Sequence, residues 1–433
     1  MESALGKQKV NNPGRRGPPV GERTQSLTLN PGKGVRGTSV DWFLIAIILI
    51  VALALVFDFT NGFHDAANAV ATVVATRALP AKWAPPFSAL FNFLAFFVVG
   101  TAVANTVAKT VNAEKATLAV IFSALFAAIA WNYITWKIGM PSSSSHAIIG
   151  GLVGAGLAAG GFAAIDWGSV SKAAIGIIAS PVVALSIAFV AVYLVYLVQK
   201  ATKWHDDHPV FKGAQVVSAA ALSFGHGAND AQKTMGVIAA LLLGAGYTTM
   251  DETGKSVVVP EWVALSAYGA IALGTLWGGW KIIETMGLRL TTLYANTGVA
   301  ANIGAVTAIF GATSVGMPIS TTHAAASSVV GAGIGSGKGA NWKVVGEMVL
   351  AWVVTIPVAG SLAFGMYYLT RLPTILAWIA VGGITIAFAA WAVWAMFHTI
   401  HARDVEQEIL PADQLDDGPE PMHPKLEGRG PVE

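Results

Sequence analysis

The 433-residue chain contains no cysteine, and only 12% of its residues are charged. The absence of cysteine excludes disulfides, thiolate metal sites and cysteine nucleophiles. Soluble domains carry about 25% charged residues, so the low charge, together with 54% hydrophobic residues, predicts a protein that crosses the lipid bilayer several times. The net charge of +2 gives no reason to expect a nucleic-acid partner.

The charged residues are concentrated at the two ends of the chain. Residues 1–38 contain seven Lys or Arg and two Asp or Glu, whereas residues 403–433 contain nine Asp or Glu and three Lys or Arg. Neither end has enough apolar residues to form a core. We therefore predict a disordered basic tail at 1–38 and a disordered acidic tail at 401–433. No secretory signal peptide is expected, because a long polar stretch precedes the first apolar run.

Between the tails, long apolar runs alternate with shorter runs that Gly, Ser, Asn or Pro interrupt. A spanning helix needs about 20 apolar residues, and suitable runs begin at Trp42, Pro86, Ala116, Ala173, Trp262, Ala295, Glu347 and Ile375. The interrupted segments hold the polar residues that the long runs lack, and they are 60–78, 140–161, 214–246 and 316–337. Non-helical backbone inside a membrane is tolerated only beside protein or a wet cavity. We expect these four segments to be broken or re-entrant helices that meet at an internal site.

Two pairs of similar segments indicate an internal duplication. Residues 140–157 (MPSSSSHAIIGGLVGAGL) and 317–334 (MPISTTHAAASSVVGAGI) are identical at nine of eighteen positions. Residues 61–66 (NGFHDA) likewise resemble 226–231 (HGANDA). We predict two repeats and the segments that flank them: 39–200 and 214–372 as repeats, 201–213 as a polar loop and 373–400 as an additional helix.

Each repeat contains about five predicted crossings, and an odd number inverts the second copy relative to the first. Inverted repeats with broken helices at the midplane are typical of secondary transporters. The predicted fold class is an all-α polytopic membrane protein with two inverted-topology repeats and about 10–12 membrane segments.

Hydroxyl side chains follow a Met-Pro pair in both repeats. Pro suits the first turn of a helix, and Ser or Thr beside it can cap that turn. Because a helix N-terminus presents free N–H groups and partial positive charge, two such ends could surround a tetrahedral oxyanion. The simpler alternative is N-capping alone. The duplication favours an anion site, whose candidate hydroxyls are Ser143, Ser144, Ser145, Ser320, Thr321 and Thr322.

Asp65 and Asp230 occupy matching positions in the two repeats. A charged side chain at the bilayer centre costs about 2.5–3.5 kcal/mol on insertion scales, and such residues usually mark an ion or proton path. Asn61, Asn68 and Asn229 lie nearby in the sequence, and their carbonyl oxygens are ligands that hard cations prefer. We predict a coupling site for a cation or proton; the alternative is that the carboxylates cap helices at the breaks.

At these residues the chain resembles the Pit-type inorganic phosphate transporter family, in its bacterial low-affinity permeases. The resemblance covers about residues 40–372 and rests on NGFHDAANAV, GHGANDAQKTMGV, GMPSSSSHAIIGG and GMPISTTHAAASSVVGAG. It implies symport of phosphate, in bacteria often as a metal–phosphate complex, with H⁺ or Na⁺ as the coupling cation and no other cofactor. It also implies a homodimer in the plasma membrane. Asn68 and Asn229 match the family signature beside Asp65 and Asp230.

Two residues depart from that signature. His64 stands where the signature has Asn, and Lys233 stands where it has a second Asn. A fixed ammonium could fill the space that a sodium ion fills elsewhere, and histidine titrates near neutral pH. We therefore predict proton coupling that involves these two residues, with sodium coupling as the alternative.

Three other functions compete with phosphate symport. A sulfate permease of the same fold would use the same anion site. An intramembrane Ser/His/Asp hydrolase is disfavoured, because Ser145 and His146 are adjacent in the chain and catalytic triads assemble from residues brought together in space. A passive anion channel would be lined by Lys or Arg rather than by carboxylates. We expect a transporter and not an enzyme.

Overall fold

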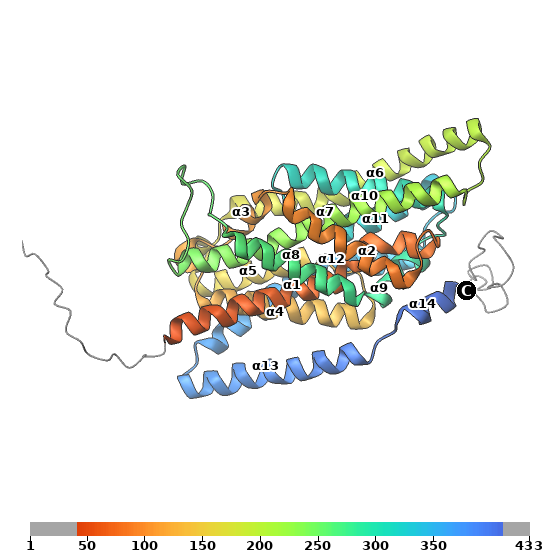
Figure 1. The fold of residues 1–433 in the computed structure, drawn as a ribbon. Coiled ribbons are helices and arrows are strands. Elements are labelled where there is room, and N and C mark those ends of the chain that lie inside the picture. Colours follow the sequence, from red (N-terminus) through yellow and green to blue (C-terminus); the bar gives the residue numbers. More distant parts are fainter. Residues whose placement is uncertain (1–40, 410–433) are drawn as a thin grey trace, which may run out of the picture. The chain divides into compact units, whose positions relative to one another are not determined.

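The described part of the chain, residues 41–409 of a computed structural model, is built from α-helices with two isolated β-bridges. The predicted tail at 1–38 lies outside the described residues. The predicted tail at 401–433 begins with a short helix, and its remainder from residue 410 also lies outside them. The α-helices, in chain order (Figure 1), are α1 Trp42–Ala75, α2 Ala84–Leu94, α3 Ala102–Ala108, α4 Leu118–Ile138, α5 Ser144–Gly160, α6 Trp167–Thr202, α7 Pro209–Gly244, α8 Glu261–Trp277, α9 Trp280–Glu284, α10 Ala295–Ser314, α11 Thr321–Gly335, α12 Trp342–Thr370, α13 Thr374–Phe397 and α14 Ala402–Ile409.

Seven described helices are long and apolar enough to cross a membrane. An eighth span results if Ala81–Phe97 and Ala102–Ala108, which are bent by 87° at a short break, count as one. The multi-span helical class is therefore confirmed, with one bent or re-entrant pair. The predicted 10–12 segments exceed this number partly because α8 has 17 residues and α11 only 15.

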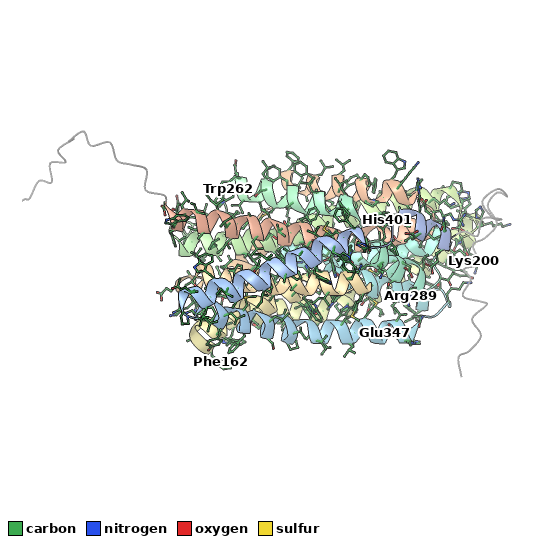
Figure 2. The ribbon with its side chains drawn as sticks, turned by 90° about the horizontal axis from the view of Figure 1, so that it is seen from below. Phe162, Lys200, Trp262, Arg289, Glu347 and His401 are labelled. Atoms are coloured by element: carbon green, nitrogen blue, oxygen red, sulfur yellow. The ribbon has the colours of Figure 1, made fainter. Side chains whose placement is uncertain are left out.

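The side chains labelled in Figure 2 mark the two opposite ends of the helix bundle. Figure 2 shows Lys200, Arg289 and His401 toward one end and Phe162 and Trp262 toward the other. Along the flank, α13 is apolar all round and almost entirely exposed, as a helix in contact with lipid is expected to be. These features suit a protein whose helices run across a bilayer between two aqueous faces.

The acidic motifs lie inside long uninterrupted helices, so the predicted helix breaks at 60–78 and 214–246 are wrong. α1 is 34 residues long and continues past Asp65 to Ala75, and α7 is 36 residues long and continues past Asp230 to Gly244. The polar side chains do not end these helices, because they form hydrogen bonds with other buried polar groups.

α1 and α7 run antiparallel. Asn61 on α1 contacts Asp230 on α7 at 3.4 Å, while Thr76, which directly follows α1, donates a 2.7 Å hydrogen bond to Gln215, which lies earlier on α7. Residue numbers therefore rise along one helix as they fall along the other. Positions near the start of one acidic motif face positions near the end of the other.

The breaks predicted at the two Met-Pro pairs are confirmed. Residues 140–143 and 317–320 are extended, and each leads directly into a helix, α5 or α11. The preceding chain turns at Gly139 and Gly316, both with positive φ, a conformation that glycine adopts without steric cost. Two short helices thus begin inside the bundle, where their N-termini are buried.

Small residues bring α5 against α12. A Cβ atom added to Gly154 would lie 2.0 Å from the carbonyl oxygen of Gly360. Small residues at such crossings allow close backbone approach where no hydrophobic effect drives association. The position of α5 therefore depends on this contact.

We expect Gly154→Ala to destabilise the protein by about 1–3 kcal/mol, the usual cost of overpacking. The measurement is thermal unfolding of the purified protein in detergent. Gly269→Ala is the matched control, because it also lies within a helix and has no heavy atom within 4 Å of the added Cβ. Equal melting temperatures for the two variants would contradict the close contact.

Candidate functional site

Ser143 and Ser320 cap the two buried helices. The Ser143 hydroxyl accepts the His146 N–H at 3.2 Å, and the Ser320 hydroxyl accepts the His323 N–H at 3.1 Å. These two predicted substrate ligands are therefore N-caps in this structure, as the simpler alternative describes. The next residues of each helix present their hydroxyls to other partners.

The hydroxyl after each cap reaches the acidic residue of its own repeat. Ser144 donates to Asp65 Oδ2 at 2.8 Å, and Thr321 donates to Asp230 Oδ2 at 3.2 Å. All four side chains are buried. The two halves of the site therefore have the same internal pairing, as the sequence duplication leads one to expect.

Other contacts join the two halves. Thr322 donates to Asp65 Oδ1 at 3.2 Å, and the Asn68 amide donates to both Thr321 and Thr322, at 3.3 and 3.1 Å. Ser145 donates to the Ile319 carbonyl at 2.7 Å. The N-termini of α5 and α11 consequently lie side by side against α1.

His146 and His323 lie behind this group and contact each other. Their rings are 4.4 Å apart, and His323 stacks on Trp352 at 4.0 Å. Trp352 also donates from its indole to the Pro141 carbonyl at 3.0 Å. The matched histidines therefore pack against α12 and support the loops that carry the hydroxyls.

His64 bridges Asp65 to a second polar group. Its Nδ1 is 2.6 Å from Asp65 Oδ1, and its Nε2 is 3.0 Å from the Thr135 hydroxyl and 3.2 Å from the Ser142 hydroxyl. All these side chains are buried. The imidazole thus links the carboxylate to hydroxyls on α4 and on the loop before α5, a chain of groups that can pass a proton.

Asp230 has a cation as its nearest partner. Lys233 Nζ lies 2.5 Å from Asp230 Oδ1, and neither side chain is exposed. Asp230 Oδ2 lies 3.4 Å from both His226 Nε2 and Asn61 Nδ2. A fully buried ion pair is retained only when its charges compensate each other closely.

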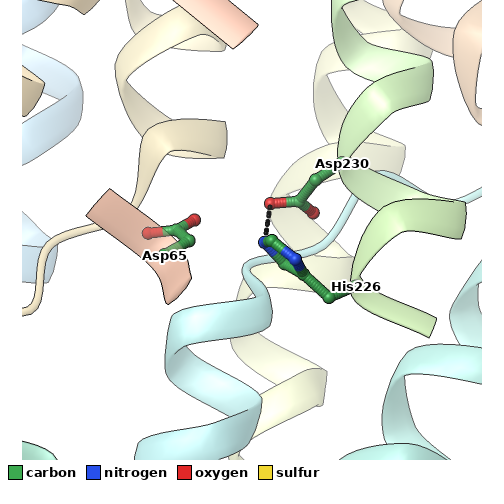
Figure 3. A group of neighbouring side chains, drawn as sticks. All are labelled: Asp65, His226 and Asp230. Carbon is green, nitrogen blue, oxygen red and sulfur yellow. Dashed lines mark ion pairs between the residues drawn. The ribbon is translucent and has the colours of Figure 1, made fainter. Parts of the chain in front are cut away.

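Asp65, His226 and Asp230 also form one cluster. One ligand atom from each lies within 4.8 Å of the others, and all three residues are buried. Figure 3 shows Asp65 on α1 facing His226 and Asp230 on α7. Such a group could hold a metal ion, but the Lys233 ammonium already neutralises one oxygen of Asp230.

The structure does not bring every predicted residue to this centre. The Asn229 amide donates to Thr313 at 2.9 Å and to the Met317 carbonyl at 3.3 Å, both away from the hydroxyl pairs. It therefore ties α7 to the end of α10 and to the loop before α11. The side-chain carbonyl oxygens of Asn61, Asn68 and Asn229 all lack a hydrogen-bond partner among the described residues.

The sequence interpretation missed Asp58. This residue lies on α1 and is fully buried, but it follows directly on a long apolar run and its duplicate position holds Ser223. The repeat therefore gives no signal for it. Helical spacing does: Asp58, Asn61, Asp65 and Asn68 are three or four residues apart, which places them on one face.

Comparison with known proteins identifies relatives over the same region. Residues 61–363 match the model of the "Phosphate transporter family". A "Probable low-affinity inorganic phosphate transporter" of Rhizobium meliloti is 45% identical over 74% of this chain and 95% of its own length. A Bacillus subtilis protein with the same description is 41% identical over 77% of this chain and 99% of its own length.

A solved structure has the same fold. It is titled "The sodium-dependent phosphate transporter", has a TM-score of 0.67 and is 26% identical to this chain. The similarity covers 76% of this chain and 99% of that one.

Proposed function

Because the chain belongs to the phosphate transporter family, we propose that it imports inorganic phosphate across the bacterial plasma membrane by proton symport. Family membership makes the chain an integral membrane transporter and not an enzyme. The proposal concerns the coupling ion, the site residues and the direction of transport.

One observation carries the proposal: two buried helix N-termini meet at two buried carboxylates. The N-termini of α5 and α11 offer backbone N–H groups, and Ser144, Ser145, Thr321 and Thr322 add hydroxyl donors. Helix N-termini stabilise phosphate through these N–H groups and the helix dipole. We assign phosphate binding to these hydroxyls, with Asn68 orienting Thr321 and Thr322.

The same contacts explain why phosphate binding needs a cation. The hydroxyls that would bind phosphate donate to Asp65 and Asp230, so the anion would be bound beside two carboxylates. Like charges at such short range in a buried site are strongly unfavourable. Entry of a positive charge with each phosphate removes this repulsion, which couples the two fluxes.

Lys233 favours a proton over sodium as that charge. Its ammonium lies against Asp230 and beside the cluster with Asp65, where a sodium ion would otherwise find its ligands. His64 then supplies an imidazole next to Asp65 that can accept or donate a proton. The Asn61 side-chain amide also lies 3.4 Å from Asp230 Oδ2.

Sodium coupling is the second candidate. The structural neighbour at 26% identity is titled as sodium-dependent, and the unpartnered carbonyl oxygens of Asn61 and Asn68 are suitable sodium ligands.

Sulfate is the competing substrate, because it is also tetrahedral.

Two inverted repeats are the proposed architecture. The antiparallel α1 and α7, and the matched pairs Ser144–Asp65 and Thr321–Asp230, support a two-fold relation between the halves. In this arrangement α5, which is one of the seven candidate spans, and the shorter helix α11 both enter the membrane with their N-termini inside the bundle. We also propose a homodimer, which light scattering of the detergent-solubilised protein would test.

The test is uptake of radioactive phosphate into proteoliposomes under an imposed ΔpH, with and without Na⁺. We expect accumulation that follows ΔpH, needs no Na⁺, and is not reduced by excess sulfate. A parallel series with and without Mg²⁺ distinguishes free phosphate from metal–phosphate. Uptake that requires Na⁺ and ignores ΔpH would overturn proton coupling, and uptake that sulfate abolishes would overturn the substrate assignment.

We expect Ser144→Ala and Thr321→Val each to raise the KM for phosphate about tenfold or more. Hydrogen bonds to charged groups contribute about 1.5–3 kcal/mol, and each variant removes one such donor. Initial uptake rates over a range of phosphate concentrations provide the measurement. Ser171→Ala, an exposed hydroxyl on α6, is the control. An unchanged KM in both variants would remove these hydroxyls from the anion site.

A further inference from the structure

Asp58 is a buried carboxylate that the proposed mechanism does not use. Its exposed fraction is 0%, and neither carboxylate oxygen accepts a hydrogen bond of normal geometry among the described residues. The Thr234 hydroxyl on α7 and the Asn61 amide on α1 lie close to it, and the Thr234 hydroxyl is also buried. An ionised carboxylate in such a place costs several kcal/mol unless a charge or a proton compensates it.

The charged groups near Asp58 come from the neighbouring helices. Lys233 and Asp230 on α7 lie close enough to interact electrostatically with the Asp58 carboxylate, and so does Tyr268 on α8. Tyr268 is neutral in its ordinary state, and its hydroxyl also has no hydrogen-bond partner among the described residues. Lys233 is thus the nearby cation for both Asp58 and Asp230.

The antiparallel helices explain how Asp58 and Lys233 come together. Asn61 faces Asp230, so the residue three positions earlier on α1 faces the residue three positions later on α7. Those residues are Asp58 and Lys233. Neither has a charged counterpart in the other repeat, because their duplicate positions hold Ser223 and Asn68.

The charges of this trio do not balance when all three groups are ionised. One ammonium and two carboxylates leave a net charge of −1, whereas one bound proton makes the group neutral. Asp230 is held in a 2.5 Å ion pair with Lys233, whereas Asp58 has no hydrogen bond of normal geometry among the described residues, only the nearby Thr234 hydroxyl and Asn61 amide. Asp58 is therefore the carboxylate that can take up a proton without breaking the ion pair of Asp230.

We propose that Asp58 is the carboxylate that carries the coupling proton, with Lys233 as the fixed charge that links its protonation to the phosphate site. This inference rests on the proposed proton symport. When Asp58 loses its proton, the Lys233 ammonium has to compensate the negative charges of both Asp58 and Asp230. The strength of the negative charge beside Ser144 and Thr321 then depends on whether Asp58 is protonated.

The test compares Asp58→Asn with the wild type in proteoliposomes. We expect Asp58→Asn to keep phosphate exchange without a gradient within about threefold of the wild-type rate. ΔpH-driven accumulation should be lost, and the exchange rate should depend on pH between 5 and 8 less steeply than in the wild type, because only the protonation of phosphate and of the other groups remains. Glu252→Gln, an exposed acid in the loop before α8, is the control, and Asp58→Glu should restore accumulation.

The outcomes separate the two proposals. If the wild type does not accumulate phosphate under ΔpH, proton symport itself is wrong. If the wild type accumulates phosphate and Asp58→Asn does so equally, only the role of Asp58 is wrong. If Asp58→Asn lowers stability but keeps the wild-type accumulation ratio and pH profile, Asp58 is merely a counter-ion of Lys233, which also overturns the proposal.

A second measurement applies if Asp58→Asn does not yield folded protein. Infrared difference spectra of the purified wild type, recorded across the same pH range, report the C=O stretch of a protonated carboxyl group. Asp58→Glu should shift that band, because the carboxyl group is then in a glutamate. A band that stays in place would assign the proton to another carboxylate and overturn the proposal.

Discussion

Asp65→Asn is expected to abolish accumulation of phosphate against its gradient while leaving exchange of internal for external phosphate. A ΔpH of two units supplies about 2.7 kcal/mol per proton, which corresponds to about 100-fold accumulation for each coupled proton. Asp65 accepts hydrogen bonds from Ser144 and Thr322 and lies 2.6 Å from His64. Without its charge, the anion no longer requires a proton to enter. The accumulation ratio should fall from about 100 to about 1.

The experiment measures the steady-state accumulation ratio and counterflow in the same proteoliposomes. Glu114→Gln, an exposed acid outside the helices that form the site, is the control for charge removal. Counterflow that is lost together with accumulation would assign Asp65 to phosphate binding. A wild-type accumulation ratio would remove Asp65 from the mechanism altogether.

Lys233→Asn is expected to convert the transporter from one that ignores sodium into one that needs it. Removing one partner of a buried ion pair costs about 3–5 kcal/mol, because the other charge is left uncompensated. In this variant Asp230 and Asp58 both lose the Lys233 ammonium. The substitution also makes position 233 the same residue type as its duplicate, Asn68. The carbonyl oxygen of the new asparagine side chain can bind sodium. Sodium should therefore recover both stability and uptake.

Thermal unfolding and phosphate uptake, each measured in Na⁺ and in K⁺, test this prediction. Lys200→Asn, which removes an exposed ammonium near the end of α6, should leave both unchanged. A Lys233→Asn variant that is equally unstable in both salts would show that the ammonium has a structural role only. Wild-type uptake in K⁺ would show that the ammonium is dispensable.

The sequence predicts the family, the helical membrane class and the breaks at the Met-Pro pairs. These features depend on local signals: apolar run length, proline, and a repeated motif. The candidate hydroxyls of the proposed anion site could be named for the same reason, because Ser144 and Thr321 stand at the same place in two copies of one motif. The structure then shows which of the neighbouring hydroxyls serve as caps, namely Ser143 and Ser320.

The predicted breaks at the acidic motifs failed because polar residues do not by themselves interrupt a buried helix. α1 satisfies its backbone internally, and its polar side chains find partners on α5, α7 and α11. Those partners are distant in sequence, so no local pattern reveals them. Asp58 was missed for a related reason: its neighbours in the chain are apolar, and its charged neighbours lie on α7.

The antiparallel pairing of α1 and α7 has a consequence for how the two halves of such a chain can evolve. Away from the centre of the pair, where Asp65 and Asp230 meet, a residue of α1 faces a residue of α7 that is not its duplicate. A change in one copy can therefore be compensated by a different change in the other. Asp58 and Lys233 are such a pair: each is unique to its copy, and they are neighbours in space. After duplication, one copy could carry an acid and the other a base at these facing positions, while the helices that both copies share stayed the same. Related chains that have lost the acid at position 58 are therefore expected to have lost the lysine at 233 as well.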